Sequence, residues 1–347
     1  MEPKTFVGLD VHKKTVVATA VDRLGNLIDQ SEFGPSDDEL IAYLRTLPGN
    51  QRVVLEASPV WEHFFDAASS TGAEVLVSNP YKTRLIAEAS LKSDKVDSAA
   101  LATLLRLDAV PTTYVPDERT RALRRAVRDR VYYRRLETSI RNHIYGALLA
   151  RGIPYEAGVL LRKARREELR AHGITEVDRG LDALISLEAT TKDATSTIHA
   201  AFRESSEAQL LHSIPGIGEL TAVALVAFLC PINRFPSFDR LSSYAGLCPT
   251  NHQSSSTSYQ GALKPDCNHI LRWLLVESQW VHRHHCRNGY VARVGRRITR
   301  RKGGSRGAVA AAHALLRVVF ATLKRGTPFT KDAPEGPSCK VKPAESG

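Results

Sequence analysis

The first hundred residues alternate short apolar runs, rich in β-branched residues, with segments of helical spacing. We expect strands at residues 5–22, interrupted by a charged turn at 12–14, and at LGNLIDQSEF, RVVLEAS and AEVLVSNP. We expect helices at residues 36–47, 60–70 and 93–107, the first and last capped by Ser36 and Ser93. Strands that alternate with helices form a sheet with helices on its faces, so this part of the chain is predicted to be an α/β domain.

The helix expected at residues 93–107 carries its own apolar periodicity. The stripe expected to face the core consists of Val96, Ala99, Ala100, Leu101 and Leu104. The segment AVPTTYVPDE follows and contains two prolines, which end the first domain near residue 116.

The pattern changes completely beyond residue 116. Residues 119–203 are long, charged and helical, with a single proline at Pro154, which predicts a helical hairpin or coiled-coil connector. LLHSIPGIGELTAVALVAFL then predicts two helices around a Pro-Gly-Ile-Gly turn, the form of a helix-hairpin-helix. In such a unit Gly216 and Gly218 would let backbone N–H groups approach a DNA phosphate, although an ordinary turn between helices has a similar sequence.

The remaining C-terminal segments are also mainly helical. Helices are expected at 238–246, 268–284 and 307–324, separated by a polar loop and by the cationic stretch RNGYVARVGRRITRRKGGSRG. A chain of 347 residues exceeds the usual size of one core. We therefore predict four regions: an α/β catalytic domain at 1–116, a helical connector at 117–204, a mainly helical C-terminal domain at 205–326 and a disordered tail at 327–347.

The charge balance favours a polyanionic partner. The formal net charge is +11 and the pI is about 9.5, which points first to nucleic acid. A basic membrane-binding helix is the competing interpretation, but the positive residues spread over two long regions. The candidate phosphate contacts are Arg121, Arg124, Arg125, Arg128, Arg296, Arg297, Arg300 and Arg301. Tyr132, Tyr133 and Tyr145 lie among arginines and would either stack on unpaired bases or anchor helix packing.

Cysteine usage and hydropathy point to the cytoplasm. The five cysteines are an odd number, widely spaced and without a CxxC pair, which is typical of a reducing compartment. HRHHC at residues 282–286 lacks a second ligand pair, so a zinc site is not expected. The N-terminus has no signal-peptide pattern, and the longest apolar run, at 220–229, is too short to span a bilayer.

Four acidic residues fall at positions that a folded sheet would bring together. Asp10 and Glu56 end two different strands, and Asp94 and Asp97 share one face of a helix. Phosphoryl transfer on nucleic acid uses divalent cations, and Mg²⁺ (or Mn²⁺) prefers carboxylate oxygens. Each acid has a plainer explanation as a turn or helix-terminal residue. The position of Glu56 argues against this structural explanation, because an acid directly after Val53-Val54-Leu55 is costly unless it is paired, exposed or metal-bound.

One alternative use of the first strand is ATP binding. VGLDVHKKT is similar to the first phosphate loop of actin-like ATPases and sugar kinases, which share the ribonuclease H sheet topology. No matching second glycine-rich phosphate loop follows, so ATP hydrolysis ranks low.

Five motifs in a single order resemble those of a known family. They are VGLDVHKKT, VVLEAS, SDKVDSAALA, LLHSIPGIGELTAVALVA and FDRLSSYAGLCPTNHQSSS. They resemble the insertion-sequence one-ten family of transposases, relatives of the pilin-gene invertases, over residues 6–329. The resemblance implies a RuvC-like ribonuclease H domain, a coiled-coil connector and a C-terminal transposase domain. It also implies that Asp10, Glu56, Asp94 and Asp97 bind divalent metal.

The same resemblance implies a serine nucleophile and further partners. The family serine follows an AGL-x-P segment, here Ala245–Pro249, which places Ser254 in register. The family pattern often has glycine directly after the serine, whereas Ser255 follows Ser254 in this sequence, so Ser255 or Ser256 is the alternative nucleophile. The implied partners are donor and target DNA, a structured non-coding bridge RNA, and further copies of the chain, as a homodimer or a tetramer in the synapse.

Two other functions fit the sequence. The first is a RuvC-like metal-dependent nuclease or Holliday-junction resolvase that cuts with water alone. The second is a non-catalytic nucleic-acid-binding protein in which the acids are structural.

Overall fold

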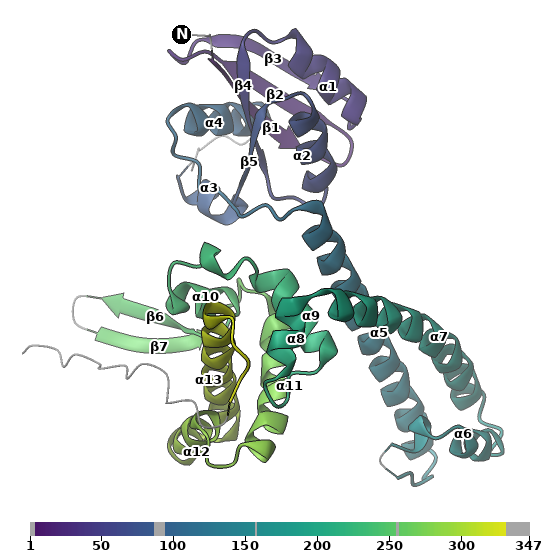
Figure 1. Ribbon diagram of the computed structural model, residues 1–347. Coiled ribbons are helices and arrows are strands. Elements are labelled where there is room, and N and C mark those ends of the chain that lie inside the picture. The colour runs from purple at the N-terminus through teal and green to yellow at the C-terminus, as the bar shows by residue number, and fades with distance from the viewer. Residues whose placement is uncertain (1–3, 87–93, 157, 255–256, 331–347) are drawn as a thin grey trace, which may run out of the picture. The chain divides into compact units, whose positions relative to one another are not determined.

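A computed structural model describes residues 4–86, 94–156, 158–254 and 257–330 (Figure 1). The chain divides into two compact units, Met1–Pro116 and Asp117–Gly347.

The first unit is built on a mixed five-stranded sheet with the order β3-β2-β1-β4-β5. Its strands are β1 Lys4–Val11, β2 Val16–Val21, β3 Leu27–Phe33, β4 Asn50–Glu56 and β5 Glu74–Ser78. The first three strands form an antiparallel meander, and β4 and β5 run parallel to β1. The expected strands and the α/β class of this part are confirmed.

Helices cover both faces of this sheet. The helices are α1 Asp37–Thr46, α2 Trp61–Ser70, α3 Pro80–Ile86, which the sequence pattern did not indicate, and α4 Asp94–Arg106. Val7, Leu9 and Leu55 belong to the core under α1 and α2. Phe6 and Val54, at alternating positions, pack instead with Leu101 and Leu105 of α4. Ser36 is the N-cap of α1 but accepts no side-chain capping bond, and Ser93 lies outside the described residues.

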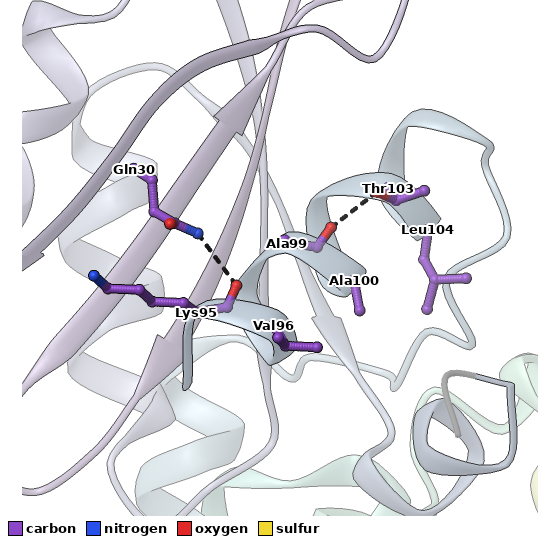
Figure 2. Close-up of a pocket in the computed structure, with 7 residues that line it drawn as sticks. All are labelled: Gln30, Lys95, Val96, Ala99, Ala100, Thr103 and Leu104. Carbon is purple, nitrogen blue, oxygen red and sulfur yellow. Dashed lines mark hydrogen bonds between the residues drawn. The ribbon is translucent and has the colours of Figure 1, made fainter. Parts of the chain in front are cut away.

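The face that α4 turns to the core differs from the expected one. Leu101 and Leu104 are buried, but Val96 is 38% exposed, and Ala99 and Ala100 are half-buried. The buried face includes the polar Ser98. Figure 2 shows the outer face, where a shallow pocket is lined by Gln30, Lys95, Val96, Ala99, Ala100, Thr103 and Leu104. The prediction was right for Leu101 and Leu104 but wrong for Val96, because apolar spacing alone cannot account for a polar residue, Ser98, that finds a partner in the sheet.

The second unit begins with a long helical hairpin (Figure 1). Its elements are α5 Glu118–Leu149, the 3₁₀ turn η1 Val159–Leu161, α6 Lys163–Arg170 and α7 Thr175–Glu204. Pro154 lies in the connection between α5 and α7, as expected. Val127 and Val131 of α5 and Ile198 of α7 share one core with the C-terminal helices. The hairpin is therefore joined to those helices by a common apolar interior.

The rest of the second unit is mainly helical. Its elements are α8 Ser206–His212, α9 Glu219–Leu229, the 3₁₀ turn η2 Ile232–Arg234, α10 Phe238–Tyr244, α11 His269–His285, α12 Tyr290–Lys302 and α13 Gly304–Arg325. Two segments differ from expectation. The polar loop contains the antiparallel strands β6 Pro249–Ser254 and β7 Thr257–Leu263, and the cationic stretch forms α12.

Two features of the C-terminal part bear on the sequence predictions. By length and hydropathy, α13 is the single membrane-span candidate in the described part of the chain, but its buried residues, such as Leu315 and Val319, belong to the unit's core. Of the tail expected to be disordered, residues 327–330 are described, and the Phe329 N–H donates to Ser213 Oγ at 2.8 Å. Residues 331–347 lie outside the described residues.

Candidate functional site

Strand register brings two of the predicted acids to neighbouring positions. Leu9 of β1 pairs with Leu55 of the parallel strand β4, so Asp10 and Glu56 occupy the next positions at the ends of adjacent strands. Side chains alternate along a strand, and Leu9 and Leu55 face α1 and α2. Asp10 and Glu56 therefore lie on the opposite face, the one that α4 covers.

A glycine lets α4 lie directly on β1. A Cβ added at Gly8 would be 2.1 Å from the Ser98 backbone oxygen and 2.5 Å from the Ala102 backbone nitrogen. Gly8 is two residues before Asp10 and shares its face of the strand. The missing side chain therefore allows the N-terminal part of α4, with its two aspartates, to reach the strand end where Asp10 lies.

Polar contacts hold the start of α4 against the sheet. Ser98 Oγ lies 2.8 Å from Thr19 Oγ1, and both side chains are buried. Gln30 Nε2 donates to Thr19 Oγ1 at 3.0 Å and to the Lys95 carbonyl at 3.2 Å; Figure 2 shows the second of these bonds. These bonds explain why a serine faces the core, since its hydroxyl is satisfied there.

The four acids form one electrostatic group, here called the carboxylate cluster (Asp10, Glu56, Asp94 and Asp97). Burial raises the pKa of Asp10, which the neighbouring His12 opposes and Asp94 and Asp97 reinforce. Burial also raises the pKa of Glu56, and the charges of Asp10 and Asp97 add to it. The structure thus brings the predicted acids together, and their mutual repulsion favours a bound cation.

The cluster contains one residue that the sequence reasoning missed. His12 Nε2 lies 3.2 Å from Asp10 Oδ2 and 3.6 Å from Asp94 Oδ1. The first motif could have indicated His12, because Asp10 and His12 are two residues apart at the end of β1 and residues at this spacing point to the same side of an extended strand. Atoms of Asp10, His12 and Asp94 lie within 4.8 Å of one another, a spacing that suits a divalent cation. The donor set of oxygens with one imidazole nitrogen therefore fits such an ion.

The predicted nucleophile belongs to the other unit. Ser254 is the last residue of β6 and is paired in register with Thr257 of β7. Its side chain and the alternatives Ser255 and Ser256 lie outside the part of the chain that the structure describes.

The predicted arginines of α5 fall into two pairs. Arg121 is only 5% exposed, and Arg124 Nε donates to the Ala227 carbonyl of α9 at 2.8 Å. Arg125 and Arg128 are exposed. Burial and a helix-to-helix bond give the first pair a structural role, whereas the second pair lies at the surface, with the Arg128 guanidinium 5.8 Å from the centroid of the Phe228 ring.

The tyrosines near these arginines also differ from one another. Tyr132 is 58% exposed and makes an edge contact with Tyr133, with ring centroids 5.5 Å apart. Tyr145 stacks on Tyr155, with ring centroids 4.2 Å apart, and both pack against a small apolar core. Packing therefore accounts for Tyr145, whereas the ring of Tyr132 is accessible.

The two glycines of the Pro-Gly-Ile-Gly turn have different surroundings. Gly216 has φ +89°, and a Cβ there would lie 2.6 Å from the Ser278 carbonyl oxygen of α11. His282 Nδ1 of the same helix lies 2.8 Å from the Pro215 carbonyl. Gly218 is the N-cap of α9, with no atom within 4 Å of its Cβ position. Packing against α11 explains Gly216, whereas the surroundings of Gly218 are open.

Helix α12 presents a continuous cationic face. Arg296, Arg297, Arg300 and Arg301 are exposed, while Val291, Ala292 and Gly295 on the other side are buried. Gly295 faces Ala311 of α13, where an added Cβ would be 3.1 Å from the alanine Cβ. Within the described chain, no carboxylate forms an ion pair with the last three of these arginines. Their charge is therefore available to an external anion.

The arginines of the helical hairpin contrast with this face. Arg166 pairs with Glu188, Arg170 with Asp182, and Arg151 with Glu176. Their charges are neutralised within the hairpin, so this region is less suited to bind a polyanion than α12.

Comparison with known proteins finds similarity to transposases over most of the chain. A family model described as "Transposase" matches residues 7–151, and one described as "Transposase IS116/IS110/IS902 family" matches residues 208–293. The chain is 24% identical to the transposase for insertion sequence element IS1111A of Coxiella burnetii, over 94% of this chain and 91% of that protein. It is also 24% identical to the transposase for insertion sequence element IS1328 of Yersinia enterocolitica, over 94% and 99%. A 31% identical match covers 40% of this chain and 34% of an uncharacterised protein of insertion element IS110 from Streptomyces coelicolor.

Proposed function

Because the chain belongs to the IS110 family of insertion-sequence transposases, we propose that it cuts and exchanges DNA strands at a divalent-metal site formed by the carboxylate cluster. The observation that carries this proposal is the convergence of Asp10, Glu56, Asp94 and Asp97, with their mutual charge repulsion, at one end of the sheet. Bound Mg²⁺ or Mn²⁺ would lower the barrier by activating the attacking oxygen and stabilising the leaving one.

The chain's own residues have distinct parts in this mechanism. Asp10 and Glu56 are half-buried on adjacent strands, so they provide ligands whose positions are determined by the sheet. Asp94 and Asp97 come from the first turn of α4 and add two carboxylates to those of the strand ends. The sheet order, with a three-stranded meander and two parallel strands, supports a RuvC-like ribonuclease H domain at residues 1–116.

We propose Ser254 as the nucleophile, by its position after the Ala245–Pro249 segment. Its Oγ would form a bond to the DNA phosphorus while the bond from phosphorus to the leaving DNA oxygen breaks, and the proton of the serine passes to a base or to solvent. A hydroxyl of the partner strand then attacks the phosphoserine and releases the serine. Each step exchanges one phosphodiester bond for another, so no ATP is needed.

The test is covalent trapping of DNA on purified protein with Mg²⁺. Ser254→Ala is expected to lose the protein–DNA adduct, while Ser255→Ala and Ser256→Ala keep it and serve as matched controls. An adduct lost with one of the controls instead would move the nucleophile to that serine. Cutting that continues in all three variants would favour a nuclease or resolvase that uses water. DNA binding without Mg²⁺-dependent cutting in the wild type, unchanged in Asp10→Asn, would favour a non-catalytic nucleic-acid binder.

The cationic face of α12 is proposed to contact nucleic-acid phosphates, with Arg125 and Arg128 as a second patch. Each lost phosphate contact lowers the salt slope of binding by about 0.9. Alanine at Arg297, Arg300 and Arg301 together is therefore expected to lower it by up to about 2.7. Arg165→Ala is the control, since Glu168 already neutralises this exposed arginine at 2.6 Å. An unchanged slope in the triple variant would exclude α12 as the contact.

The family resemblance also supports a guide RNA and a multimeric complex in the cytoplasm. We propose residues 117–204 as the connector and residues 205–326 as the domain that carries the serine. The composite site would take its metal from one protomer and its serine from another, in a dimer or tetramer. Sequencing RNA that co-purifies with the protein, and comparing it with DNA beside the gene, tests the guide.

A further inference from the structure

Among the described residues of the site, His12 offers a nitrogen donor beside the carboxylate oxygens. It follows β1 directly, and its backbone N–H donates to the Thr15 carbonyl at 2.9 Å, which defines the turn that carries the imidazole. Asp10, two residues earlier, points to the same face of the strand. The half-exposed ring of His12 is therefore held beside Asp10 and Asp94 and remains open to solvent.

The distances suit a shared coordination sphere. His12 Nε2 is 3.2 Å from Asp10 Oδ2 and 3.6 Å from Asp94 Oδ1, and the three donor atoms lie within 4.8 Å of one another. An octahedral ion with bonds of about 2.0–2.1 Å separates neighbouring donors by about 3 Å. Small side-chain rotations would thus place all three atoms around one cation, with the backbone unchanged.

The chemistry of the donor decides which cation benefits. Carboxylates and water suit Mg²⁺, whereas an imidazole nitrogen favours transition ions over Mg²⁺. We propose that His12 is a ligand of the divalent-metal site and gives that site a preference for Mn²⁺ over Mg²⁺. This inference rests on the proposed metal-dependent function and deepens it by assigning a fifth residue and an ion selectivity to the same site.

A competing role for His12 makes the opposite prediction. If the imidazole only bonds to Asp10 and Asp94 in the metal-free protein, an incoming ion must displace it. Its removal would then leave metal binding unchanged or make it tighter, for Mn²⁺ and Mg²⁺ alike. The sign of the change therefore separates a ligand from a competitor.

The experiment uses the full chain without DNA and measures metal binding, not activity. Free Mn²⁺ is counted by electron paramagnetic resonance during titration, and Mg²⁺ affinity is obtained by competition against Mn²⁺. In His12→Ala the Kd for Mn²⁺ is expected to rise by about tenfold or more, because the loss of even an outer residue around a metal ion commonly lowers metal affinity by about 10- to 100-fold. The Kd for Mg²⁺ is expected to change less, so the preference for Mn²⁺ falls. His12→Asn, which offers an amide oxygen, should keep Mg²⁺ binding while losing the preference.

A matched control lies in the same unit. His63 Nδ1 is 2.6 Å from Asp37 Oδ1. The His63 side chain is 46% exposed, which is similar to the 51% of the His12 side chain. His63→Ala removes a comparable histidine–aspartate contact away from the carboxylate cluster. It should leave both affinities at wild-type values, and circular dichroism verifies that each variant is folded.

The outcomes separate this inference from the function beneath it. Wild-type affinities and preference in His12→Ala, with binding abolished in Asp10→Asn, would overturn the role of His12 while the metal site stands. Tighter Mn²⁺ binding in His12→Ala would identify a competitor and also overturn it. A wild-type protein that binds neither ion would remove both proposals.

Discussion

Replacing Gly8 by alanine tests whether the contact between α4 and β1 builds the site. The added Cβ would lie 2.1 Å from the Ser98 carbonyl oxygen, while ordinary contacts begin at 3.4 Å, so the helix backbone must retreat by about 1.3 Å. Overpacking of this kind costs about 3 kcal/mol when backbone has to move. Alanine recovers about 0.5–1 kcal/mol of strand propensity. The expected net loss of stability is about 2 kcal/mol.

The same shift would displace Asp94 and Asp97 from Asp10 and Glu56. A displacement near 1 Å at reacting groups costs on the order of 10²-fold in rate, so Mg²⁺-dependent DNA cleavage by Gly8→Ala should fall by about that factor. Stability is measured by urea unfolding, and cleavage with a labelled DNA substrate.

A second glycine in the same unit provides the control. At Gly34 the three atoms nearest to an added Cβ all belong to the carboxylate of Glu39, the closest at 2.6 Å, which is the end of a flexible side chain. Gly34→Ala should therefore change stability by no more than about 0.5 kcal/mol and leave cleavage intact. If Gly8→Ala matched this control in both assays, the close approach of α4 would not be needed, and the reasoning would be refuted.

Three further predictions follow from the two units. In metal-free protein, burial and repulsion raise the pKa of Asp10 and Glu56, so the folded state holds their protons more tightly than the unfolded state does. The free energy of unfolding should therefore fall as pH rises above the usual carboxyl range. Urea midpoints measured in EDTA should show this fall, with a weaker pH dependence in Asp10→Asn. Thr19→Val removes the hydroxyl that Ser98 and Gln30 contact, and should cost about 1–3 kcal/mol and weaken Mg²⁺ binding; an unchanged urea midpoint would contradict the role of these contacts. Gly216→Ala puts a side chain at φ +89° against a backbone carbonyl of α11, so thermal unfolding should reveal a loss of about 2 kcal/mol or more, whereas a pure phosphate-binding glycine would leave the melting temperature unchanged.

The strands and the acids were predictable because their signals are local. Alternation in VGLDVHKKT and the run before Glu56 marked two strands whose ends carry acids, and the i, i+3 spacing of Asp94 and Asp97 put both on one helix face. The register of β1 and β4 then converts those positions into neighbours.

Other features were missed because their cause lies in a distant segment. The inward orientation of Ser98 depends on Thr19, which is 79 residues away. The polar stretch after residue 248 was expected to be a loop, but pairing between β6 and β7 makes it a hairpin. The cationic stretch forms α12 because its small residues pack on α13, a contact that charge counts do not reveal.

By itself, the sequence determined the α/β start of the chain, the helical remainder, the positive charge and the four candidate metal ligands. All of these follow from residue types and spacings within a few turns or strand repeats. Tertiary structure alone decided that His12 lies beside the carboxylate cluster and that Arg121 is buried while the α12 arginines are exposed. It also decided that α4 packs directly on Gly8 and α11 directly on Gly216. Those outcomes depend on which surfaces meet, and contact between segments far apart in the chain is governed by packing and hydrogen bonding that no short window of sequence contains.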